Sequence, residues 1–381
     1  MECKTGLSLV RPGTEFNRNL PKYRGNNVMG EPKVPASGAK MTFLVRGDDL
    51  RGRLTPDSAP GGYDSRVFAV LSDLAKGHAM RRTTRFRQLI DQSEILILPG
   101  AHDALSVRMI ELAGFEAFTA GGYAATATLL GAPDIGQLGL AEMADHYARL
   151  CDTTPLPILA DADTGYGSTI NVARTLRAYE RAGVAALFIE DQVAPKRCGH
   201  MDGKRVVPVT EMVAKIKSAV DARVDQDLVV MARTDARAIE GLEAAIERAQ
   251  IYREAGADLI FVEAPLTADE MARICSEIPA PCMANNVEGG KTPVLPAAQL
   301  EDIGYACVAF PVAATYAIAH TLRRLYATLR ESGDTQAMQN EMLNFASFHD
   351  IVRLPALREM ERGCDGFARD LLEKVAARAV D

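Results

Sequence analysis

The chain has 381 residues, of which 48% are hydrophobic, and its formal net charge is -7 at pH 7. A chain of this length and composition can bury a large core, and one α/β barrel of about 250 residues with extensions fits it. The acidic balance excludes the basic footprint of a nucleic-acid-binding protein. The apolar runs, such as Leu187-Phe188-Ile189, are far shorter than the roughly 20 residues of a membrane helix.

The cysteines and the first residues predict a reduced, cytoplasmic setting. The seven cysteines are odd in number and scattered, and no C-x-x-C pair occurs among them. Met1-Glu2-Cys3-Lys4 lacks the apolar core of a secretory signal. Any cysteine chemistry must therefore come from a single thiol.

Residues 1–80 are rich in Gly, Pro, Arg and Asn and show no sustained apolar period, which predicts a loosely ordered N-terminal extension. An accessory arm and a wrongly chosen start site are both compatible with it. Arg81 to Ile90 has the pattern of a helix and opens the ordered part of the chain.

From about Glu94, short β-rich runs alternate with helix-like stretches, as in the βα units of a parallel sheet. Three of the stretches end in Ala-Gly, where glycine can take the left-handed conformation that stops a helix. There are eight runs, which are Ile95–Leu98, Ala117–Ala120, Ile158–Asp161, Ala186–Glu190, Leu228–Arg233, Leu259–Glu263, Cys282–Asn285 and Cys307–Phe310.

Eight such units fit either a closed barrel or a doubly wound sheet. Polar residues at the carboxyl ends of five runs favour the barrel, because there they converge on one rim. Capping of the next helix is the alternative for each of them taken singly. They are Asp161 and Asp163, Glu190 and Asp191, Arg233 and Asp235, Glu263, and Asn285 and Asn286. We therefore predict a (β/α)8 TIM-type barrel over residues 81–315.

Residues 316–381 form a predicted helical segment. The candidate helices are Thr315 to Glu331, Thr335 to Val352 and Leu357 to Ala377. They either cover the barrel or exchange with a neighbouring subunit.

The segment Asp161-Ala162-Asp163 ends the third run with two carboxylates, and glycines follow it. Hard oxygen ligands of this kind suit Mg²⁺, with Mn²⁺ as a possible substitute, and Glu190 could complete the site directly or through water. A surface turn is the alternative reading of D-x-D.

Lys196-Arg197-Cys198-Gly199-His200 places a thiol between cations and a histidine in a glycine-containing loop. These neighbours predict a depressed pKa for Cys198 and proton exchange near neutral pH. The alternative, a small buried hydrophobe, is what we expect for Cys275, Cys282 and Cys307.

Taken together, these segments resemble the isocitrate lyase and phosphoenolpyruvate mutase superfamily, and within it the methylisocitrate lyase and 2-alkylmalate lyase branch. K-R-C-G-H combined with D-A-D-T-G-Y-G is highly specific, and the phosphonate-forming mutases lack the cysteine motif. The matching motifs are Lys196–His200, Asp161–Gly167, Gly131–Asp134, Glu190–Gln192, Arg233–Ala236 and Asn285–Pro293.

The resemblance implies a Mg²⁺-dependent lyase that breaks a carbon–carbon bond in a small 2-hydroxy di- or tricarboxylate. Residues matching Asp161, Asp163 and Glu190 hold the metal in such lyases, and the cleavage leaves pyruvate or glyoxylate. Cys198 would protonate the carbanion. Lys196, Arg197 and His200 would tune the thiol and close the loop.

The resemblance also implies a set of substrate contacts. Arg233 would hold substrate carboxylate, and Glu263 and Asn285 would orient the carboxylate groups. The backbone amides of Gly122 and Tyr123 would bind the pyruvyl carboxylate.

Two further positions lie near these amides in the family's pattern. Gly121 stands where the family often has serine. Asp134 either supports the metal's water shell or caps the next helix.

The stretch Glu288–Pro293 looks more like 2-alkylmalate lyases, including dimethylmalate lyase, than like methylisocitrate lyase. An oxaloacetate hydrolase or decarboxylase on the same scaffold is the second hypothesis. Pro293 argues against it, because related hydrolases tend to have a hydroxyl residue near this position. A non-catalytic binding barrel is the third. By analogy with the family, we expect a homotetramer that takes a small hydroxy-carboxylate and neither nucleic acid nor membrane.

Overall fold

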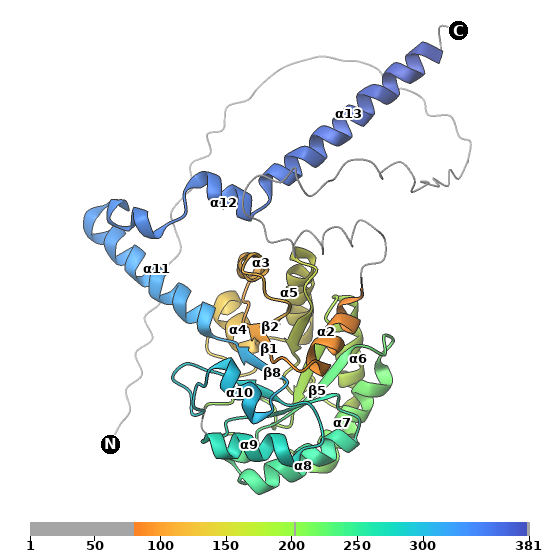
Figure 1. Cartoon of the computed structure of the whole chain (residues 1–381), viewed down its shortest axis with the longest axis vertical. Helices are drawn as coiled ribbons and strands as arrows, with labels where there is room; N and C mark the ends of the chain where they lie inside the picture. The colour runs from red at the N-terminus through yellow and green to blue at the C-terminus, as the bar shows by residue number, and fades with distance from the viewer. Residues whose placement is uncertain (1–79, 202, 379–381) are drawn as a thin grey trace, which may run out of the picture. The chain divides into compact units, whose positions relative to one another are not determined.

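The computed structural model of the protein describes residues 80–201 and 203–378 (Figure 1). The predicted N-terminal extension, apart from Met80, lies outside the described residues. The described part begins with a helix, α2 (Arg82–Asp91), and continues as alternating strands and helices.

Eight parallel strands close into a ring. Two hydrogen-bonded sheets, β1-β8-β7 and β2-β3-β4-β5-β6, are joined by the bridges Gly100 to Thr119 and Ile260 to Cys282. The predicted closed barrel is therefore confirmed over the doubly wound alternative. The strands are β1 Leu96–Pro99, β2 Phe118–Ala120, β3 Ile158–Asp161, β4 Ala186–Glu190, β5 Val229–Thr234, β6 Leu259–Val262, β7 Met283–Asn285 and β8 Cys307–Phe310.

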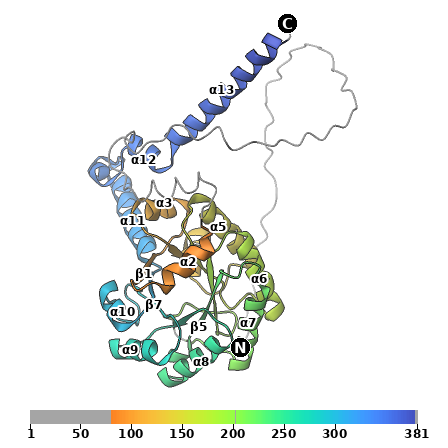
Figure 2. The same cartoon turned by 45° about the vertical axis from the view of Figure 1, so that its right-hand side comes forward.

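Helices surround the ring of strands, as Figures 1 and 2 show from two directions. Their amphipathic sequences pack one side on the strands, and buried residues such as Tyr147, Tyr179 and Tyr252 lie in that layer. The helices are α3 Ala104–Leu112, α4 Gly122–Leu130, α5 Leu140–Thr153, α6 Thr169–Arg181, α7 Val209–Ala222, α8 Leu242–Glu254, α9 Ala268–Glu277 and α10 Ala297–Ile303, with the short 3₁₀ turn η2 Ala236–Ala238 before α8.

The three Ala-Gly stops behave as the sequence predicts. Gly114, Gly183 and Gly256 have φ angles of 83°, 87° and 106°, each one residue past the last turn of its helix. A side chain is strained in this left-handed region, so glycine ends each helix and turns the chain into the next strand.

The barrel interior is a core of its own, distinct from the layer between strands and helices. It is filled by inward side chains such as Leu98, Phe188 and Met231, and α2 adds Phe86 and Leu89, which are fully buried. Arg87 on α2 contacts Asp258, which precedes β6. Helix α2 therefore covers the amino-terminal end of the barrel, which leaves the opposite rim for the polar residues.

After β8 the chain is helical, as expected, in α11 Ala313–Ser332, η3 Gln336–Glu341, α12 Phe345–Ile351 and α13 Leu354–Arg378. The single helix predicted from Thr335 to Val352 was wrong, because η3 ends at Glu341 and Asn344 starts α12 by accepting a hydrogen bond from Ser347 N. Asparagine at this position favours a new helix start.

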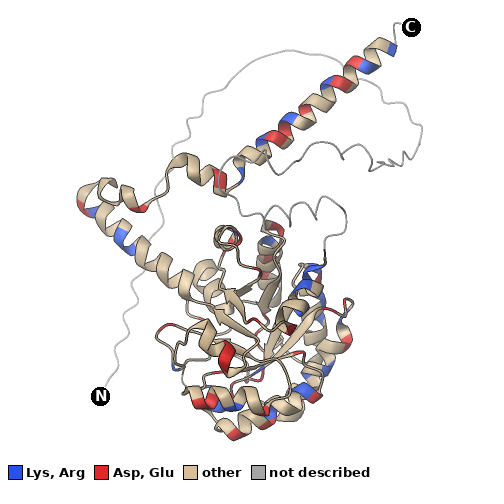
Figure 3. Ribbon diagram, in the orientation of Figure 1, with Lys and Arg blue, Asp and Glu red and all other residues tan. Residues whose placement is uncertain are grey.

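No residue of α11, α12 or α13 has a buried side chain, although many are apolar. Acidic and basic residues are interspersed along α13 (Figure 3). Within the described residues, no helix combines the length and the apolar character needed to cross a membrane.

Candidate active site

A cavity of about 240 Å³ opens where the strands end. Its polar wall includes Asp134, Asp161, Lys196, Cys198, Arg233 and Glu263. Its apolar wall includes Phe188, Phe261, Met283, Ala309 and Tyr316. Side chains from many strand ends therefore meet in one cavity, as expected for the carboxyl-terminal rim of a barrel.

Strand register brings Glu190 and Arg233 together. The two residues are direct partners in the pairing of β4 with β5, so their side chains leave the sheet at the same level. Arg233 Nη1 lies 3.3 Å from Glu190 Oε2, and Glu190 is fully buried. Burial raises the pKa of Glu190 well above its usual range even beside Arg233 and Lys196.

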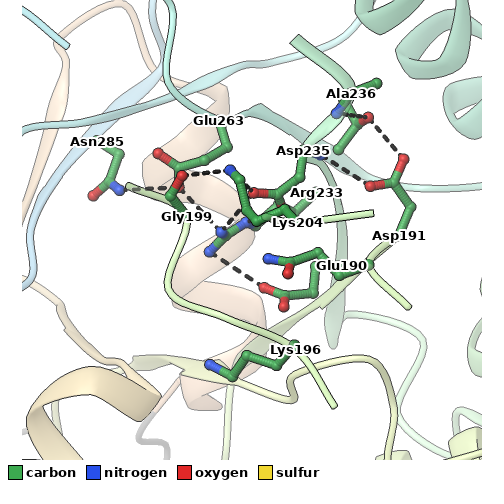
Figure 4. Close-up of polar contacts among 12 residues, drawn as sticks. Glu190, Asp191, Lys196, Gly199, Lys204, Arg233, Asp235, Ala236, Glu263 and Asn285 are labelled. Carbon is green, nitrogen blue, oxygen red and sulfur yellow. Dashed lines mark hydrogen bonds and ion pairs between the residues drawn. The ribbon is translucent and has the colours of Figure 1, made fainter. Parts of the chain in front are cut away.

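Arg233 is the centre of an ion-pair network (Figure 4). Its Nε and Nη2 donate to the two carboxylate oxygens of Asp235 at 3.0 and 3.1 Å, and Nη2 lies 3.4 Å from Glu263 Oε2. The guanidinium also lies over the rings of Phe188 and Phe261, 6.0 and 5.2 Å from their centroids. Arg233 is thus held rigidly by three carboxylates and two aromatic rings.

A second group of charges surrounds the Lys196 ammonium. Lys196 Nζ lies 2.7 Å from Asp134 Oδ2 and 2.7 Å from Asp163 Oδ1. Burial alone would lower the pKa of Lys196, but the carboxylates of Asp163, Asp161, Glu190 and Asp134 raise it, so the side chain is a cation. Burial raises the pKa of Asp163 to about 7, with the charge of Asp161 adding to the effect.

Asp161 is held by backbone amides. Its Oδ2 accepts from Gly122 N and its Oδ1 from Asp163 N, each at 2.8 Å. Asp163 has a φ of 47°, a left-handed conformation that a non-glycine residue rarely adopts. Such strain is typical of functional positions.

This acidic group fits a divalent cation. Four carboxylates, those of Asp134, Asp161, Asp163 and Glu190, face the single ammonium of Lys196, and both carboxylate oxygens of Glu190 are buried without a hydrogen-bond partner. Across residues 80–201 and 203–378, no three His, Cys, Asp or Glu side chains are already grouped as ligands of one ion. Mg²⁺ usually takes only one or two carboxylates directly and keeps several waters, so the charge and donor type remain suitable.

The thiol loop, defined here as residues 192–201 and 203–206, has two arms that pair with each other. Gln192 pairs with Val206 in an antiparallel bridge, and Val193 N donates to Arg205 O at 2.8 Å. The buried Gln192 amide also brackets the backbone of Arg197, donating to its carbonyl at 2.8 Å and accepting from its N–H at 3.0 Å. These bonds present the half-buried Cys198 to the cavity.

The depressed pKa predicted for Cys198 was wrong. Burial raises the pKa of the thiol. The backbone hydrogen bond of His200 and the positive charge of Arg233 lower it, but burial has the larger effect. The neighbouring cation Lys196 is turned to Asp134 and Asp163 instead. The thiol is therefore protonated at neutral pH, which suits a proton donor better than a nucleophile.

His200 is clamped between two other loops. Its Nδ1 accepts from the backbone N–H of Lys291 at 3.1 Å, so in the neutral ring the proton lies on Nε2, which is 3.2 Å from Glu263 Oε1. A Cβ on Gly290 would lie 2.9 Å from the imidazole, so this close approach requires glycine. The E-G-G-K segment therefore contacts the thiol loop directly.

The model of the phosphoenolpyruvate phosphomutase family matches residues 86–330, more than half of the chain. The chain belongs to this family. A 2,3-dimethylmalate lyase of Eubacterium barkeri is 43% identical over 282 residues, covering 74% of this chain and 98% of the relative. A 2-methylisocitrate lyase of Bacillus subtilis (strain 168) is 42% identical over 268 residues, covering 70% and 88%.

Solved structures of family members agree. A crystal structure of 2,3-dimethylmalate lyase, described as a PEP mutase/isocitrate lyase superfamily member, has a TM-score of 0.72 and 33% identity over 75% of this chain and 96% of that one. An oxaloacetate acetylhydrolase bound to 3,3-difluorooxalacetate also gives 0.72, with 32% identity over 74% and 97%. The predicted superfamily is confirmed, and the chain's relatives are enzymes.

Most of the predicted site residues of this chain lie in or beside the cavity. Gly122, Tyr123, Cys198, His200 and Asn285 line the cavity, together with the polar wall given above. Asp163 and Glu190 are not among the lining residues and contact Lys196 and Arg233 respectively.

Several outcomes differ from the expected roles. The Gly122 amide is already bonded to Asp161, and Asn285 Nδ2 donates to Glu263 at 3.3 Å. Asp134 does not cap the next helix, because Gly139 occupies the position before α5. Asn286 donates to the backbone of Leu295 and is not a lining residue.

Some site residues were missed. Phe188, Phe261 and Met283 each lie two positions before a rim residue, so the two-residue period of a strand predicts that they point into the same space. Tyr316 lies on α11, and its hydroxyl donates to Tyr123 at 3.3 Å. No local pattern in the sequence joins those two tyrosines.

Proposed function

We propose that the chain is a divalent-metal-dependent carbon–carbon lyase that cleaves a small 2-hydroxy acid to pyruvate and a carboxylate. The observation that carries the proposal is the shared cavity, which is lined by Asp134 and Asp161 of the acidic group, by Arg233 and by the protonated thiol of Cys198. The 2-alkylmalates, such as 2,3-dimethylmalate, and 2-methylisocitrate are the substrate candidates. The named relatives include a lyase for each.

The protein's own groups would divide the work as follows. Asp161, Asp163 and Glu190 would hold Mg²⁺, which when bound would stabilise negative charge on the substrate's 2-oxygen and polarise the new carbonyl. Arg233 would attract the carboxylate beside the carbon that leaves, because it lines the cavity and keeps a fixed positive charge there. Glu263 and Asn285 would orient that carboxylate, and the Tyr123 amide in the first turn of α4 would bind the pyruvyl carboxylate, since the Gly122 amide is already bonded to Asp161.

The proton then comes from the thiol loop. The 2-hydroxyl first loses its proton to a base; as the bond between carbons 2 and 3 breaks, an oxygen lone pair forms the new carbonyl and the bonding pair moves to carbon 3 and into the adjacent carboxylate. Cys198 would donate its proton to carbon 3, and the proton is present because burial keeps the thiol neutral. Lys196 and His200 would hold the closed loop that keeps water from the carbanion, through their contacts with Asp163 and Glu263.

Oxaloacetate hydrolysis is the second candidate, supported by the structural similarity to an oxaloacetate acetylhydrolase. Pro293, which the sequence analysis used against it, is not among the cavity-lining residues, and neither is Thr292. Geometry at that point therefore favours neither reaction. The 43% identity to a dimethylmalate lyase favours the lyase.

Purified protein should be assayed with Mg²⁺ against 2,3-dimethylmalate, 2-methylisocitrate, isocitrate and oxaloacetate. We expect pyruvate from one of the first two, complete loss of turnover with EDTA, and recovery with Mg²⁺ or Mn²⁺. Acetate and oxalate from oxaloacetate alone would establish the hydrolase instead. Full turnover in EDTA would contradict the metal proposal.

Gly199 should not tolerate a side chain. A Cβ at this position would lie 2.5 Å from Arg233 Nη2 and 2.6 Å from Glu263 Cδ, both in the buried network. We expect Gly199→Ala to lower kcat/KM about 100-fold, since a shift of about 1 Å in a site has an effect of that size. Gly363→Ala is the control, because its Cβ would meet no atom within 4 Å. Equal kcat/KM for the two variants would show that the loop does not rest on Arg233.

We also infer that the C-terminal helices pack against other subunits in a homotetramer. On α13, Phe367 and Leu372 are 70% and 69% exposed, an arrangement that is unfavourable in water. Light scattering should give about four times the 41.1 kDa chain mass. Leu372→Asp should lower this mass and Glu373→Gln should not. A monomeric wild type would end this inference.

We also propose a cytoplasmic location. The six cysteines of the described residues are all free thiols, as expected for a reducing compartment.

A further inference from the structure

Lys204 has a buried side chain that the proposed reaction does not use. It lies on the returning arm of the thiol loop, and its side chain is 2% exposed. A lysine side chain is rarely buried unless its charge is paired, so its partners indicate why it lies there.

The Lys204 ammonium has two partners from different parts of the site. Nζ donates to the carbonyl oxygen of Gly199, at the tip of the loop, and to Asp235 Oδ1 at 2.6 Å. Asp235 follows β5 and is fully buried, and its carboxylate also accepts from the guanidinium of Arg233. Figure 4 shows Lys204 between Gly199 and Asp235, beside Arg233.

These contacts form a closed circuit. On one side of the loop tip, Gly199 is tied through Lys204 and Asp235 to Arg233. On the other side, His200 is tied through Glu263 to the same guanidinium. Cys198 directly precedes these two residues, so its position over the cavity depends on both ties.

The charge balance gives Lys204 a second effect. Burial alone would raise the pKa of Asp235, but Arg233 and Lys204 lower it to about 2, so the carboxylate stays ionised. Without Lys204, only the positive charge of Arg233 would oppose the effect of burial on Asp235. The Gly199 carbonyl would also lose a charge-assisted hydrogen bond, which is stronger than a neutral one.

We propose that Lys204 is a positioning residue that latches the tip of the thiol loop to the Arg233–Asp235 pair and so sets the place of Cys198. The proposal rests on the proposed function for its catalytic meaning. The latch itself concerns the accessibility of Cys198, which can be measured without any substrate.

The test compares Lys204→Met with Lys215→Met. Lys215 is a matched control, since its side chain is 6% exposed and pairs with Glu211 on α7. Iodoacetamide alkylation at Cys198, followed by peptide mass spectrometry at pH 8, should be on the order of 10-fold faster in Lys204→Met than in wild type. Lys215→Met should react at the wild-type rate. Lys204→Arg, which keeps the cation beside Asp235, should restore most of the protection.

Kinetics provide the second readout. With the hydroxy acid that the wild type cleaves, Lys204→Met should lower kcat on the order of 10- to 100-fold and change KM much less, because the loop acts after the substrate is bound. If the wild type cleaves none of the acids, the proposed function fails while the alkylation result still tests the latch.

Two outcomes would overturn the proposal. One is alkylation of Lys204→Met at the wild-type rate with unchanged kcat. The other is a folding result that gives Lys204 a structural role only. If Lys204→Met does not fold, Lys204→Gln takes its place, and failure of both to fold while Lys215→Met does would assign Lys204 to the fold and not to the thiol.

Discussion

Replacing Cys198 with alanine should lower kcat by about 10²- to 10⁴-fold, the usual range for a general acid. The thiol lies half-buried against the cavity, and burial keeps it protonated, so its loss removes the proton donor without removing a charge. Substrate KM should change little, because Arg233 and the acidic group remain. Pyruvate release measures the effect.

Cys151→Ala is the matched control for this experiment. Cys151 is also a buried free thiol with a raised pKa, but it lies on α5 and does not line the cavity. Its replacement should leave kcat unchanged. Full turnover by Cys198→Ala would remove the thiol from the mechanism.

The pH dependence of the wild type follows from the same thiol. A general acid must carry its proton, so kcat should be level below the pKa of Cys198 and fall as pH rises through it. Because burial raises this pKa, the fall should begin above the ordinary thiol value of about 8.5. This limb should be missing from the residual activity of Cys198→Ala.

Replacing Arg233 with leucine should damage both stability and activity. The guanidinium faces Glu190, Asp235 and Glu263, and all three carboxylates are buried. Leaving buried charges without their partner costs about 3–5 kcal/mol of unfolding free energy. Loss of a donor that stabilises developing negative charge should lower kcat/KM by about 10²- to 10³-fold.

Arg233→Lys separates the two effects. It should recover most of the stability in urea unfolding, because the charge remains, and little of the activity, because a single ammonium lacks the fork. Arg248→Lys is the control, since Arg248 is also buried but pairs with Asp191 and Glu240 outside the cavity. Wild-type kcat/KM in Arg233→Lys would show that Arg233 is structural only.

The barrel could be predicted from the sequence because its signals are local. Each strand is a short apolar run, five of the eight have polar residues at or just after the carboxyl end, and Gly114, Gly183 and Gly256 mark helix ends by a backbone requirement. The break before α12 could also have been predicted, because Asn344 is a favoured helix start. The exposed apolar residues of α13 show only that this helix lacks a partner within the described chain.

The sequence predicted which residues form the site, but not which charged side chains pair with one another. Local sequence surrounds Cys198 with cations and predicts an acidic thiol, whereas Lys196 is neutralised by Asp134, 62 residues away, and the loop itself buries the sulfur. Lys204 was passed over for the same reason, since Asp235 lies 31 residues further along. These pairings depend on which strands become neighbours.

The central claim is most directly tested by cleaving the substrate in D₂O and examining the carboxylate product by NMR. With 2,3-dimethylmalate, we predict pyruvate and propionate in equal amounts, with a single deuterium at carbon 2 of propionate in one configuration, because one fixed thiol delivers it. Deuterium divided equally between both configurations would mean that water, and not Cys198, protonates the carbanion. Absence of pyruvate from both 2,3-dimethylmalate and 2-methylisocitrate would contradict the lyase itself.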